Sequence, residues 1–300
     1  MTIKSPSIET GDDRIIVTYQ LNGKPDEAPK RADEISVEQT IEFPKDLVDD
    51  GDIRTKIIGH VEECSLIDSE TTRVKISYAW DLCADELPQL MNVIFGNISI
   101  QPGIKVVNLQ LPEIAKEKFP GPSFGIEGIR NIHRVYNRPF LATALKPMGL
   151  DAKSLAKMAF DLALGGIDII KDDHSLSNQH FAPFTERVKY CCEAVKQANN
   201  KTGLNCGYYP NITSPLSKFV ENAFFAQENG ASGLLISPGL MGWDAVYWLR
   251  HNGLKLPAMS HPTFHGRFVV ASKIGFSHSV HCGSLMSLAV YDRRLFPYNR

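Results

Sequence analysis

The sequence predicts an α/β protein in which an N-terminal α+β domain of ferredoxin-like type precedes an incomplete TIM-type (β/α) barrel. Strand and helix patterns follow one another in irregular order up to about residue 114, and from residue 138 they alternate regularly. A segment rich in glycine and proline, residues 119–125, separates the two parts. We therefore expect two domains, residues 1–137 and residues 138–300.

The N-terminal part combines β-type runs, one of which alternates apolar and polar side chains, with two helix-like segments. The second of these segments has Pro88 in its first turn and Gly96 at its end, as helices commonly do. In chain order, these elements are expected at residues 14–21, 31–40, 59–67, 72–79 and 87–96.

The C-terminal part shows the strand–helix repeat of a parallel barrel, with short connections between its elements. Its strands are expected at residues 140–145, 166–170, 204–209, 233–237 and 257–261, with a possible sixth at 294–297. From residue 138 to the end there are roughly 160 residues, against roughly 250 in a typical eight-unit barrel. We therefore expect a C-terminally truncated barrel.

Composition places the chain among ordinary globular proteins, with 43% hydrophobic and 22% charged residues. A net charge of −2 provides no electrostatic reason to expect binding to nucleic acid or to an anionic membrane. No apolar run approaches the length of a membrane span, and the first residues lack a signal-peptide core. The six cysteines form no CxxC pair or disulfide-like framework, so we expect reduced thiols and a cytoplasmic protein.

Charged side chains cluster where two neighbouring barrel strands end. Lys146 follows the run at 140–145, and residues 171–174, Lys-Asp-Asp-His, follow the apolar run at 166–170. Two lysines and two carboxylates there could hold a divalent cation and an anionic substrate. The simpler alternatives are an Asp-rich turn, an ion pair between Lys171 and Asp173, and a lysine at position 146 that faces solvent.

These residues resemble those of the RuBisCO large-chain superfamily and, within it, the RuBisCO-like proteins of form IV type. In that family a Lys-Pro pair ends the first barrel strand, as at residues 146–147. A Gly-Gly-x-Asp-x-x-Lys-Asp-Asp-Glu segment ends the second, and residues 165–174 read Gly-Gly-Ile-Asp-Ile-Ile-Lys-Asp-Asp-His. The similarity extends from about residue 14 to about residue 289.

The resemblance implies a metal site. It implies that CO₂ carbamylates Lys171 and that the carbamate and Asp173 bind Mg²⁺ or another divalent cation. Carbamate formation needs the neutral amine and therefore a lysine with a lowered pKa. His174 stands where the family has glutamate, and imidazole suits Zn, Mn or Fe better than Mg²⁺. Either His174 is a third ligand of an altered or weaker metal site, or it is an acid/base group.

The resemblance also implies catalytic and substrate-binding residues. Lys146 corresponds to an active-site lysine that is a candidate for moving a proton beside a carbonyl. His261 is implied as a catalytic residue that contacts substrate, and His265 as a weaker substrate contact, although histidines after strands are more often structural. Met148 and Pro262 stand where carboxylases carry a lysine and a phosphate-binding arginine, which argues against carboxylation.

Two residues of the N-terminal part resemble residues that the family inserts into the partner subunit's site. They are Glu38 and Asn97, and the resemblance implies that they bind substrate across a homodimer with shared sites. The alternative for both is an ordinary polar surface position.

The function implied is metal-assisted enolisation, isomerisation or decarboxylation of a phosphorylated keto-sugar or diketo compound, as in a 2,3-diketo-5-methylthiopentyl-1-phosphate enolase. The alternatives are a true ribulose-bisphosphate carboxylase, an inactive truncated remnant, or an unrelated Schiff-base aldolase that uses Lys146 or Lys171. The family's late strands carry much of its phosphate-binding backbone, so we expect weak sugar-phosphate binding by the chain ending at Arg300.

Overall fold

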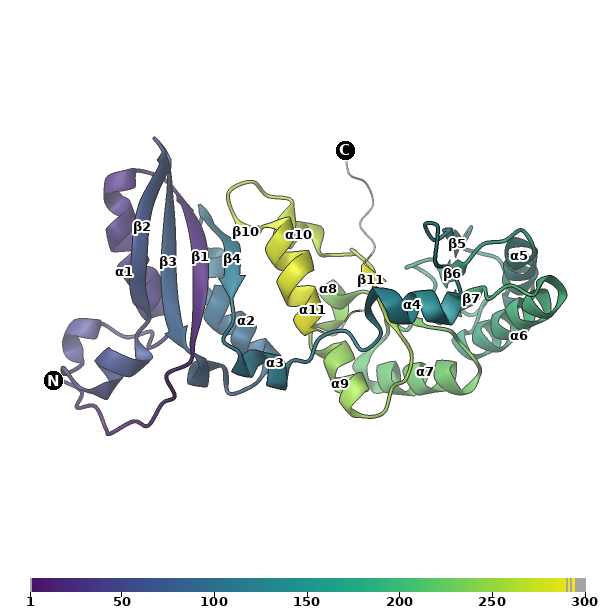
Figure 1. The fold of residues 1–300 in the computed structure, drawn as a ribbon, viewed down its shortest axis with the longest axis horizontal. Coiled ribbons are helices and arrows are strands. Elements are labelled where there is room, and N and C mark those ends of the chain that lie inside the picture. Colours follow the sequence, from purple (N-terminus) through teal and green to yellow (C-terminus); the bar gives the residue numbers. More distant parts are fainter. Residues whose placement is uncertain (1, 290, 292, 295–300) are drawn as a thin grey trace. The chain divides into compact units, whose positions relative to one another are not determined.

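The computed structural model describes residues 2–289, 291, 293 and 294. It divides the chain into two compact units, whose strands and helices are labelled in Figure 1. The first unit comprises the residues up to Pro120 together with Gly266–Leu288, and the second comprises Gly121–His265 together with the described residues from Ala289 onward. Each unit has its own sheet structure and its own buried core.

The first compact unit includes Gly266–Leu288, a segment of the predicted second domain, and the domain bounds 1–137 and 138–300 stay a prediction. Within this segment, strand β10 (Gly275–Phe276) pairs in parallel with β4 (Ile104–Gln110). The Nζ of Lys105 also donates a hydrogen bond of 2.8 Å to the carbonyl oxygen of Ala271. Because the paired residues are so far apart in the sequence, no pattern of neighbouring residues predicts this pairing.

The first unit is built on a five-stranded sheet in the order β10-β4-β1-β3-β2. Strands β1, β2 and β3 span Arg14–Asn22, His60–Asp68 and Thr71–Ala79, and they pair antiparallel, as β1 and β4 also do. The three strands predicted here are confirmed, whereas β4 was not among the predicted strands. Alternate residues of β1 are buried, beginning with Ile15 and Val17, so one face of the strand forms the core.

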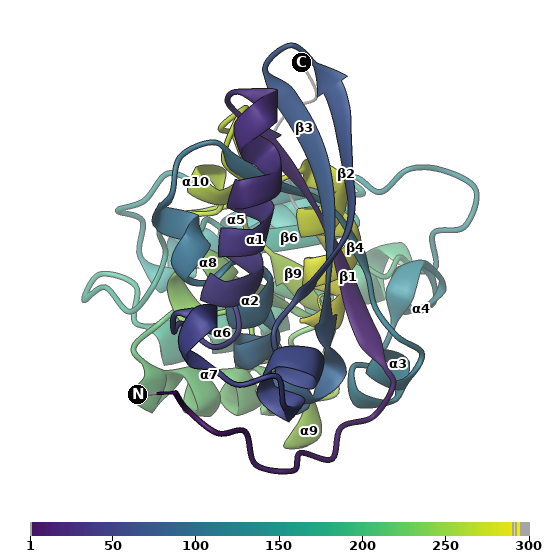
Figure 2. The ribbon, with the colours of Figure 1, turned by 90° about the vertical axis from the view of Figure 1, so that its left-hand side faces the viewer.

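Helices cover this sheet, and α1 (Ala28–Glu38) lies along it in contact with β2 and β3 (Figure 2). Tyr19 of β1 donates a hydrogen bond of 2.7 Å from its hydroxyl to the carbonyl oxygen of Ile94 in α2 (Leu87–Phe95), which ties helix to sheet. The remaining helices and helical turns of this unit are α3 (Ile114–Lys118), α10 (Gly266–Val269), α11 (Met286–Leu288), Pro25–Glu27, Lys45–Leu47, Ile53–Ile57, Trp80–Cys83, Asn97–Ile100 and Ser279–Leu285.

The second unit contains parallel strands in two groups, β5-β6-β7 and β8-β9-β11. A parallel bridge between Asn211 and Leu235 links the groups, so the strands form part of a barrel. This confirms the predicted α/β fold class with an incomplete barrel. The strands are β5 (Ala142–Leu145), β6 (Ile169–Asp172), β7 (Gly207–Tyr209), β8 (Leu234–Ile236), β9 (Ala258–Ser260) and β11 (Arg293–Arg294). Residues 295–297 of the possible sixth strand lie outside the described residues.

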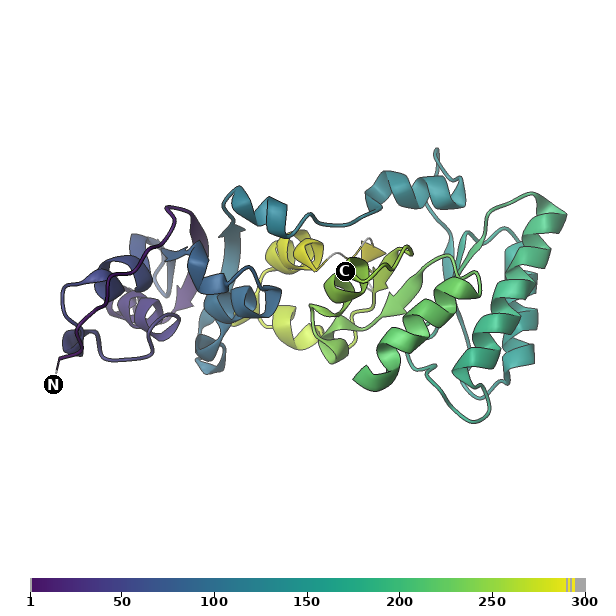
Figure 3. The ribbon, with the colours of Figure 1, turned by 90° about the horizontal axis from the view of Figure 1, so that it is seen from below.

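Helices alternate with these strands. The side chain of Asp151 caps α5 (Ala152–Leu164) by accepting a hydrogen bond of 2.7 Å from the backbone N–H of Ser154, as the sequence predicts. Helix α5 packs beside α6 (Phe184–Thr202), and α6 also contacts α7 (Leu216–Glu228) (Figure 3). The others are α4 (Gly125–His133), α8 (Pro238–Met241) and α9 (Ala245–His251). In the described part of the chain, no helix is both long and apolar enough to span a membrane.

The interior of the partial barrel is a packed core rather than a channel. One side chain from each of four strands, β6 to β9, joins a buried cluster, and Phe140 packs against it. The four residues are Ile169, Tyr209, Leu235 and Met259. Lys171 lies two residues after Ile169 and therefore on the same side of β6, toward the carboxyl end of the strand.

A glycine at position 275 is a specific requirement of the pairing between β10 and β4. Gly275 has a φ of +89°, and a Cβ added there would lie 2.1 Å from the carbonyl oxygen of Phe268. Gly230 has a similar φ of +85°, but nothing lies within 4 Å of an added Cβ. We expect Gly275→Ala to lower the free energy of unfolding clearly more than Gly230→Ala, which pays only the roughly 1–2 kcal/mol of left-handed backbone strain.

Urea titration of both variants, followed by circular dichroism, measures the difference. Equal losses of stability in the two variants would show that the close approach of Phe268 to Gly275 is not a constraint on the fold.

Candidate active site at the strand ends

The predicted charged residues lie at the carboxyl ends of two adjacent parallel strands. Lys146 follows β5 directly, and Lys171 lies near the end of β6, where it is in register with Ala144. Asp173 and His174 come immediately after β6. The strand pairing therefore brings together residues that are separated in the sequence by a whole helix.

Asp173 is the central carboxylate of this cluster. Its Oδ1 lies 3.1 Å from Nζ of Lys146 and 3.3 Å from Nδ1 of His174, and its Oδ2 accepts a hydrogen bond of 2.7 Å from Ser175. Partial burial by itself would raise the pKa of Asp173, but the Ser175 hydrogen bond, the Lys146 contact and the nearby His174 lower it to about 2. Asp173 is therefore ionised at neutral pH and presents Oδ1 to the cluster.

Lys171 is partly buried, and its Nζ donates a hydrogen bond of 3.1 Å to the carbonyl oxygen of Asp172. Burial lowers the pKa of Lys171, against the attraction of Asp173 and Asp172, and Lys146 acts in the same direction as burial. The ion pair with Asp173 is made by Lys146 rather than by Lys171, so the simple pairing considered from sequence is not the one observed.

Two histidine rings stack at this site. The rings of His174 and His261 lie 4.4 Å apart between centroids, with an angle of 14° between their planes. Burial lowers the pKa of His261 to about 4, and His174 and Lys171 act in the same direction. The Nδ1 of His261 accepts a hydrogen bond of 3.2 Å from the backbone N–H of Thr263, and the Thr263 hydroxyl lies 2.6 Å away. His261 is therefore neutral at pH 7 and carries its proton on Nε2.

His265 lies deeper than the other predicted site residues. Its side chain is 1% exposed, and its ring lies 5.9 Å from that of Trp243. Helix α8 approaches it closely, because a Cβ added at Gly239 would lie 2.8 Å from Cδ2 of His265. Burial lowers the pKa of this imidazole to about 4. Substrate contact by His265 stays a prediction.

Glu38 and Asn97 lie in the first unit, at the end of α1 and in the helical turn after α2. The side-chain amide of Asn97 donates a hydrogen bond of 3.1 Å to Oε1 of Glu38. These residues, 59 positions apart in the sequence, thus form one polar pair on the surface of the first unit.

A buried hydrogen-bond network beneath the site was not anticipated from the sequence. Asp172, which is fully buried, accepts hydrogen bonds from Nε of Arg187 (3.0 Å), the hydroxyl of Tyr208 (2.6 Å) and the backbone N–H of Asn211 (3.0 Å). Arg187 is equally buried and also donates to the carbonyl oxygens of Ala182 (2.7 Å) and Ser177 (2.8 Å). The available signal was an arginine on the apolar face of the helix predicted after residue 184.

Because of this network, Asp173 rather than Asp172 contacts the other charged side chains at the strand ends. Both carboxylate oxygens of Asp172 are engaged in the interior, whereas Oδ1 of Asp173 faces Lys146 and His174. The side-chain amide of Asn211 also donates hydrogen bonds of 2.9 Å to the carbonyl oxygens of His174 and Leu176. Asn211 therefore holds the backbone of the segment after β6 through hydrogen bonds, while the side chain of Asp173 contacts Lys146 and His174.

Within the described residues, no group of three or more His, Cys, Asp and Glu side chains is arranged to hold a metal ion. A three-ligand site at these strand ends would consequently need a ligand derived from Lys171 in addition to Asp173 and His174.

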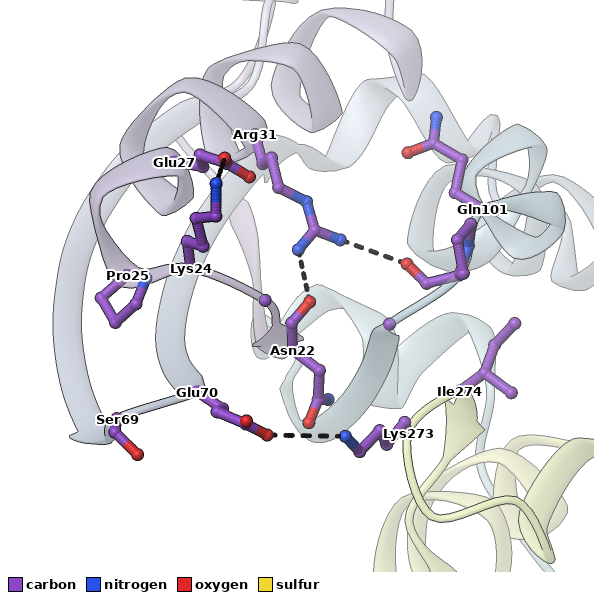
Figure 4. Close-up of a pocket in the computed structure, with 13 residues that line it drawn as sticks. Asn22, Lys24, Pro25, Glu27, Arg31, Ser69, Glu70, Gln101, Lys273 and Ile274 are labelled. Carbon is purple, nitrogen blue, oxygen red and sulfur yellow. Dashed lines mark hydrogen bonds and ion pairs between the residues drawn. The ribbon is translucent and has the colours of Figure 1, made fainter.

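Two surface clefts are lined by residues other than those of the strand ends. One in the first unit has a volume of about 1020 Å³ and is lined by residues that include Asn22, Arg31 and Lys273 (Figure 4). Arg31 there donates hydrogen bonds to backbone carbonyl oxygens, and the charges of Lys24 and Lys273 are matched by Glu27 and Glu70. The other, of about 510 Å³, lies along α6 in the second unit. Neither includes a predicted site residue.

Comparison with known proteins identifies relatives over nearly the whole chain. A family model for the ribulose bisphosphate carboxylase large chain, catalytic domain, matches residues 125–289.

Ribulose bisphosphate carboxylase-like protein 1 of Rhodopseudomonas palustris is 33% identical over 286 residues, which cover 95% of this chain and 76% of that protein. The 5-methylthioribulose-1-phosphate isomerase of Rhodospirillum rubrum is 30% identical over 286 residues, covering 95% and 75%. The 2,3-diketo-5-methylthiopentyl-1-phosphate enolase of Bacillus pumilus is 32% identical over 296 residues, covering 94% and 72%.

Solved structures show the same fold. The crystal structure of a Rubisco-like protein from Rhodopseudomonas palustris matches with a TM-score of 0.85 and 32% identity, over 94% of this chain and 76% of that one. A dimeric archaeal Rubisco from Hyperthermus butylicus matches with a TM-score of 0.86 and 25% identity, over 97% of this chain and 70% of that one. This chain thus spans about three quarters of the length of these proteins.

The buried pair of Asp172 and Arg187 predicts a large effect on stability. Arg187→Ala leaves the buried Asp172 carboxylate without its cation, which should cost about 3–5 kcal/mol of the free energy of unfolding. Lys157→Ala breaks an ion pair with Asp161 on the exposed side of α5 and should cost under about 1 kcal/mol. Chemical denaturation measures both. Similar small losses in the two variants would contradict the anchoring role of Arg187.

The buried His265 predicts an acid-dependent loss of stability. Its pKa is about 4 in the folded protein, against 6.5 for a free imidazole, so the unfolded chain binds the proton first as the pH falls. The free energy of unfolding therefore falls progressively as the pH drops from about 6.5 to about 4, by about 3 kcal/mol in total. In His265→Gln, the free energy of unfolding should depend less steeply on pH over this window, and an unchanged slope would contradict the assignment.

Proposed function

Because the chain belongs to the RuBisCO large-chain family and, within it, to the RuBisCO-like proteins, we propose that it removes a proton beside a carbonyl group of a small phosphorylated substrate. The observation that carries this proposal is the placement of Lys146, at 3.1 Å from Asp173 and beside the partly buried Lys171, at the ends of β5 and β6. Active sites of (β/α) barrels are built at this end of the strands.

Enolisation or isomerisation is the reaction class that these residues support best. The names of two relatives specify an isomerase and an enolase, each acting on a phosphorylated five-carbon compound that bears a methylthio group. In this chain, exposed apolar side chains follow three barrel strands: Met148, 46% exposed, Leu240, 55%, and Phe264, 51%. Such side chains suit the apolar end of a methylthio sugar phosphate. Carboxylation of ribulose bisphosphate is less well supported, because Met148 and Pro262 stand where the carboxylases carry cations.

The side chains at the strand ends fit a divalent cation. Oδ1 of Asp173 and Nδ1 of His174 lie 3.3 Å apart, comparable with the roughly 3 Å between neighbouring ligands around a metal with bonds of about 2.1 Å. Lys171 would supply a third ligand as a carbamate formed with CO₂, and its lowered pKa favours the neutral amine that carbamylation requires. A divalent cation such as Mg²⁺ held by these residues would polarise the substrate carbonyl and stabilise negative charge on its oxygen.

The roles of the other side chains follow from their hydrogen bonds. Lys146 is the group that moves the proton at the carbon beside the carbonyl, and its contact with Asp173 holds Nζ at the strand ends. Nδ1 of His261 is engaged by Thr263, so its Nε2–H is the donor that can bind a substrate oxygen. Neutral imidazole is the form that donates here, since the pKa of His261 is about 4.

We further propose that the chain acts as a homodimer with sites shared between subunits. The polar pair of Glu38 and Asn97 on the first unit would reach the partner's strand ends and bind substrate there. Support comes from the dimeric state that the name of the related archaeal Rubisco records.

Loss of Lys146 predicts loss of proton exchange. In D₂O, the wild-type protein supplied with bicarbonate and Mg²⁺ or Mn²⁺ should incorporate deuterium beside the carbonyl of 5-methylthioribulose-1-phosphate or of the diketo compound, as followed by NMR. Lys146→Ala should slow this exchange by at least about 100-fold, the usual contribution of a general acid or base. Lys157→Ala, which removes an exposed lysine of α5, should leave it unchanged.

Exchange that persists in Lys146→Ala would remove the assigned role of this lysine. If borohydride instead trapped substrate covalently on Lys146 or Lys171, the reaction would proceed through a Schiff base and the proposal of metal-assisted enolisation would be wrong.

A further inference from the structure

On the basis of the proposed function, we propose that the metal site at the ends of β5 and β6 favours a nitrogen-binding divalent transition metal, of the Mn²⁺, Co²⁺ and Zn²⁺ class, over Mg²⁺, and that His174 sets this preference. Mg²⁺ selects oxygen ligands in near-octahedral geometry, whereas Mn²⁺ accepts nitrogen as well as oxygen ligands and imidazole suits the later first-row metals still better. The ligand set here comprises one carboxylate, one imidazole and a lysine that can become a carbamate.

The position of His174 supports direct coordination. Nδ1 of His174 lies 3.3 Å from Oδ1 of Asp173, and the His174 side chain is 42% exposed, so an ion can reach it from solvent. The carbonyl oxygen of His174 accepts a hydrogen bond of 2.9 Å from the buried Asn211, which holds the backbone at this position. The imidazole therefore projects from a fixed backbone beside the ionised Asp173.

The stacked ring of His261 also restricts the orientation of the His174 ring. The ring of His261 stacks on it at 4.4 Å and 14°, and His261 is itself held by Thr263. Thr263 engages Nδ1 of His261, so the ring of His261 is held against the face of the His174 ring. A ring that is already oriented loses little conformational entropy on binding a metal, which strengthens its contribution.

The charges around the site weaken the binding of any divalent cation, which leaves more of the selection to the nitrogen ligand. Asp172 is turned into the interior and held by Arg187 and Tyr208, so Asp173 is the one carboxylate of this segment that faces the cluster. Lys146 already lies 3.1 Å from its Oδ1. An imidazole adds no negative charge to offset this cation, whereas a carboxylate at position 174 would. Replacement of His174 by glutamate should therefore shift the preference toward Mg²⁺.

The test measures metal affinity and metal ligation directly. Calorimetry with Mn²⁺ and with Mg²⁺, each in the presence of bicarbonate, gives the ratio of their dissociation constants for the wild type and for His174→Glu. Pulsed electron paramagnetic resonance of bound Mn²⁺ detects the ¹⁴N coupling of a coordinated imidazole. Matched variants are His251→Glu, the same substitution at an exposed histidine of α9, His261→Phe, which keeps a stacking ring, and Asp173→Ala, which removes the carboxylate.

We expect the wild type to bind Mn²⁺ with ¹⁴N coupling, and His174→Glu to lose that coupling and to reduce the preference for Mn²⁺ over Mg²⁺ by at least about tenfold. His251→Glu and His261→Phe should both keep the coupling and the preference. An unchanged preference in His174→Glu, with binding lost in Asp173→Ala, overturns the role of His174 while the proposed metal site stands. Absence of metal binding in every protein overturns the inference together with the metal site itself.

Discussion

The buried carboxylate of Asp172 is the constraint on which the rest of the site depends. A carboxylate with no exposure to solvent is strongly destabilising unless charged and polar donors surround it. Here the donors come from α6, from β7 and from the segment after β7, in Arg187, Tyr208 and Asn211. Asp172 accepts all of these hydrogen bonds and therefore joins the end of β6 to α6 and to β7.

Asp172 points toward α6, and its neighbours therefore point to the other side of β6, the side of Ile169. Successive side chains of a strand point to opposite faces, so Lys171 and Asp173 lie on the side away from the Arg187 network. The adjacent parallel strand then delivers Lys146 to the same place. The opposite directions of Asp172 and its neighbours thus produce the electrostatic character of the site: an ionised Asp173 beside a lysine whose pKa is lowered.

Much of the fold could be predicted from local patterns, and the failures have a common cause. The barrel strands and the capped helix α5 carry signals within a few residues: apolar runs, Asp151 as a cap and glycine at the helix end. Strand β4 and the two-residue strand β10 were not predicted. The pairing of β10 with β4 joins residues far apart in the chain and depends on packing such as the close approach of Phe268 to Gly275.

The sequence by itself determined that Lys146 and the segment from Lys171 to His174 each follow a strand-like apolar run, because strand period and motif spacing are local properties. Only the tertiary structure decided which aspartate faces the site, which lysine pairs with it, and that His261 stacks on His174. These outcomes depend on distances between side chains that several elements bring together. No pattern along the chain encodes such distances, because they arise only when the elements pack.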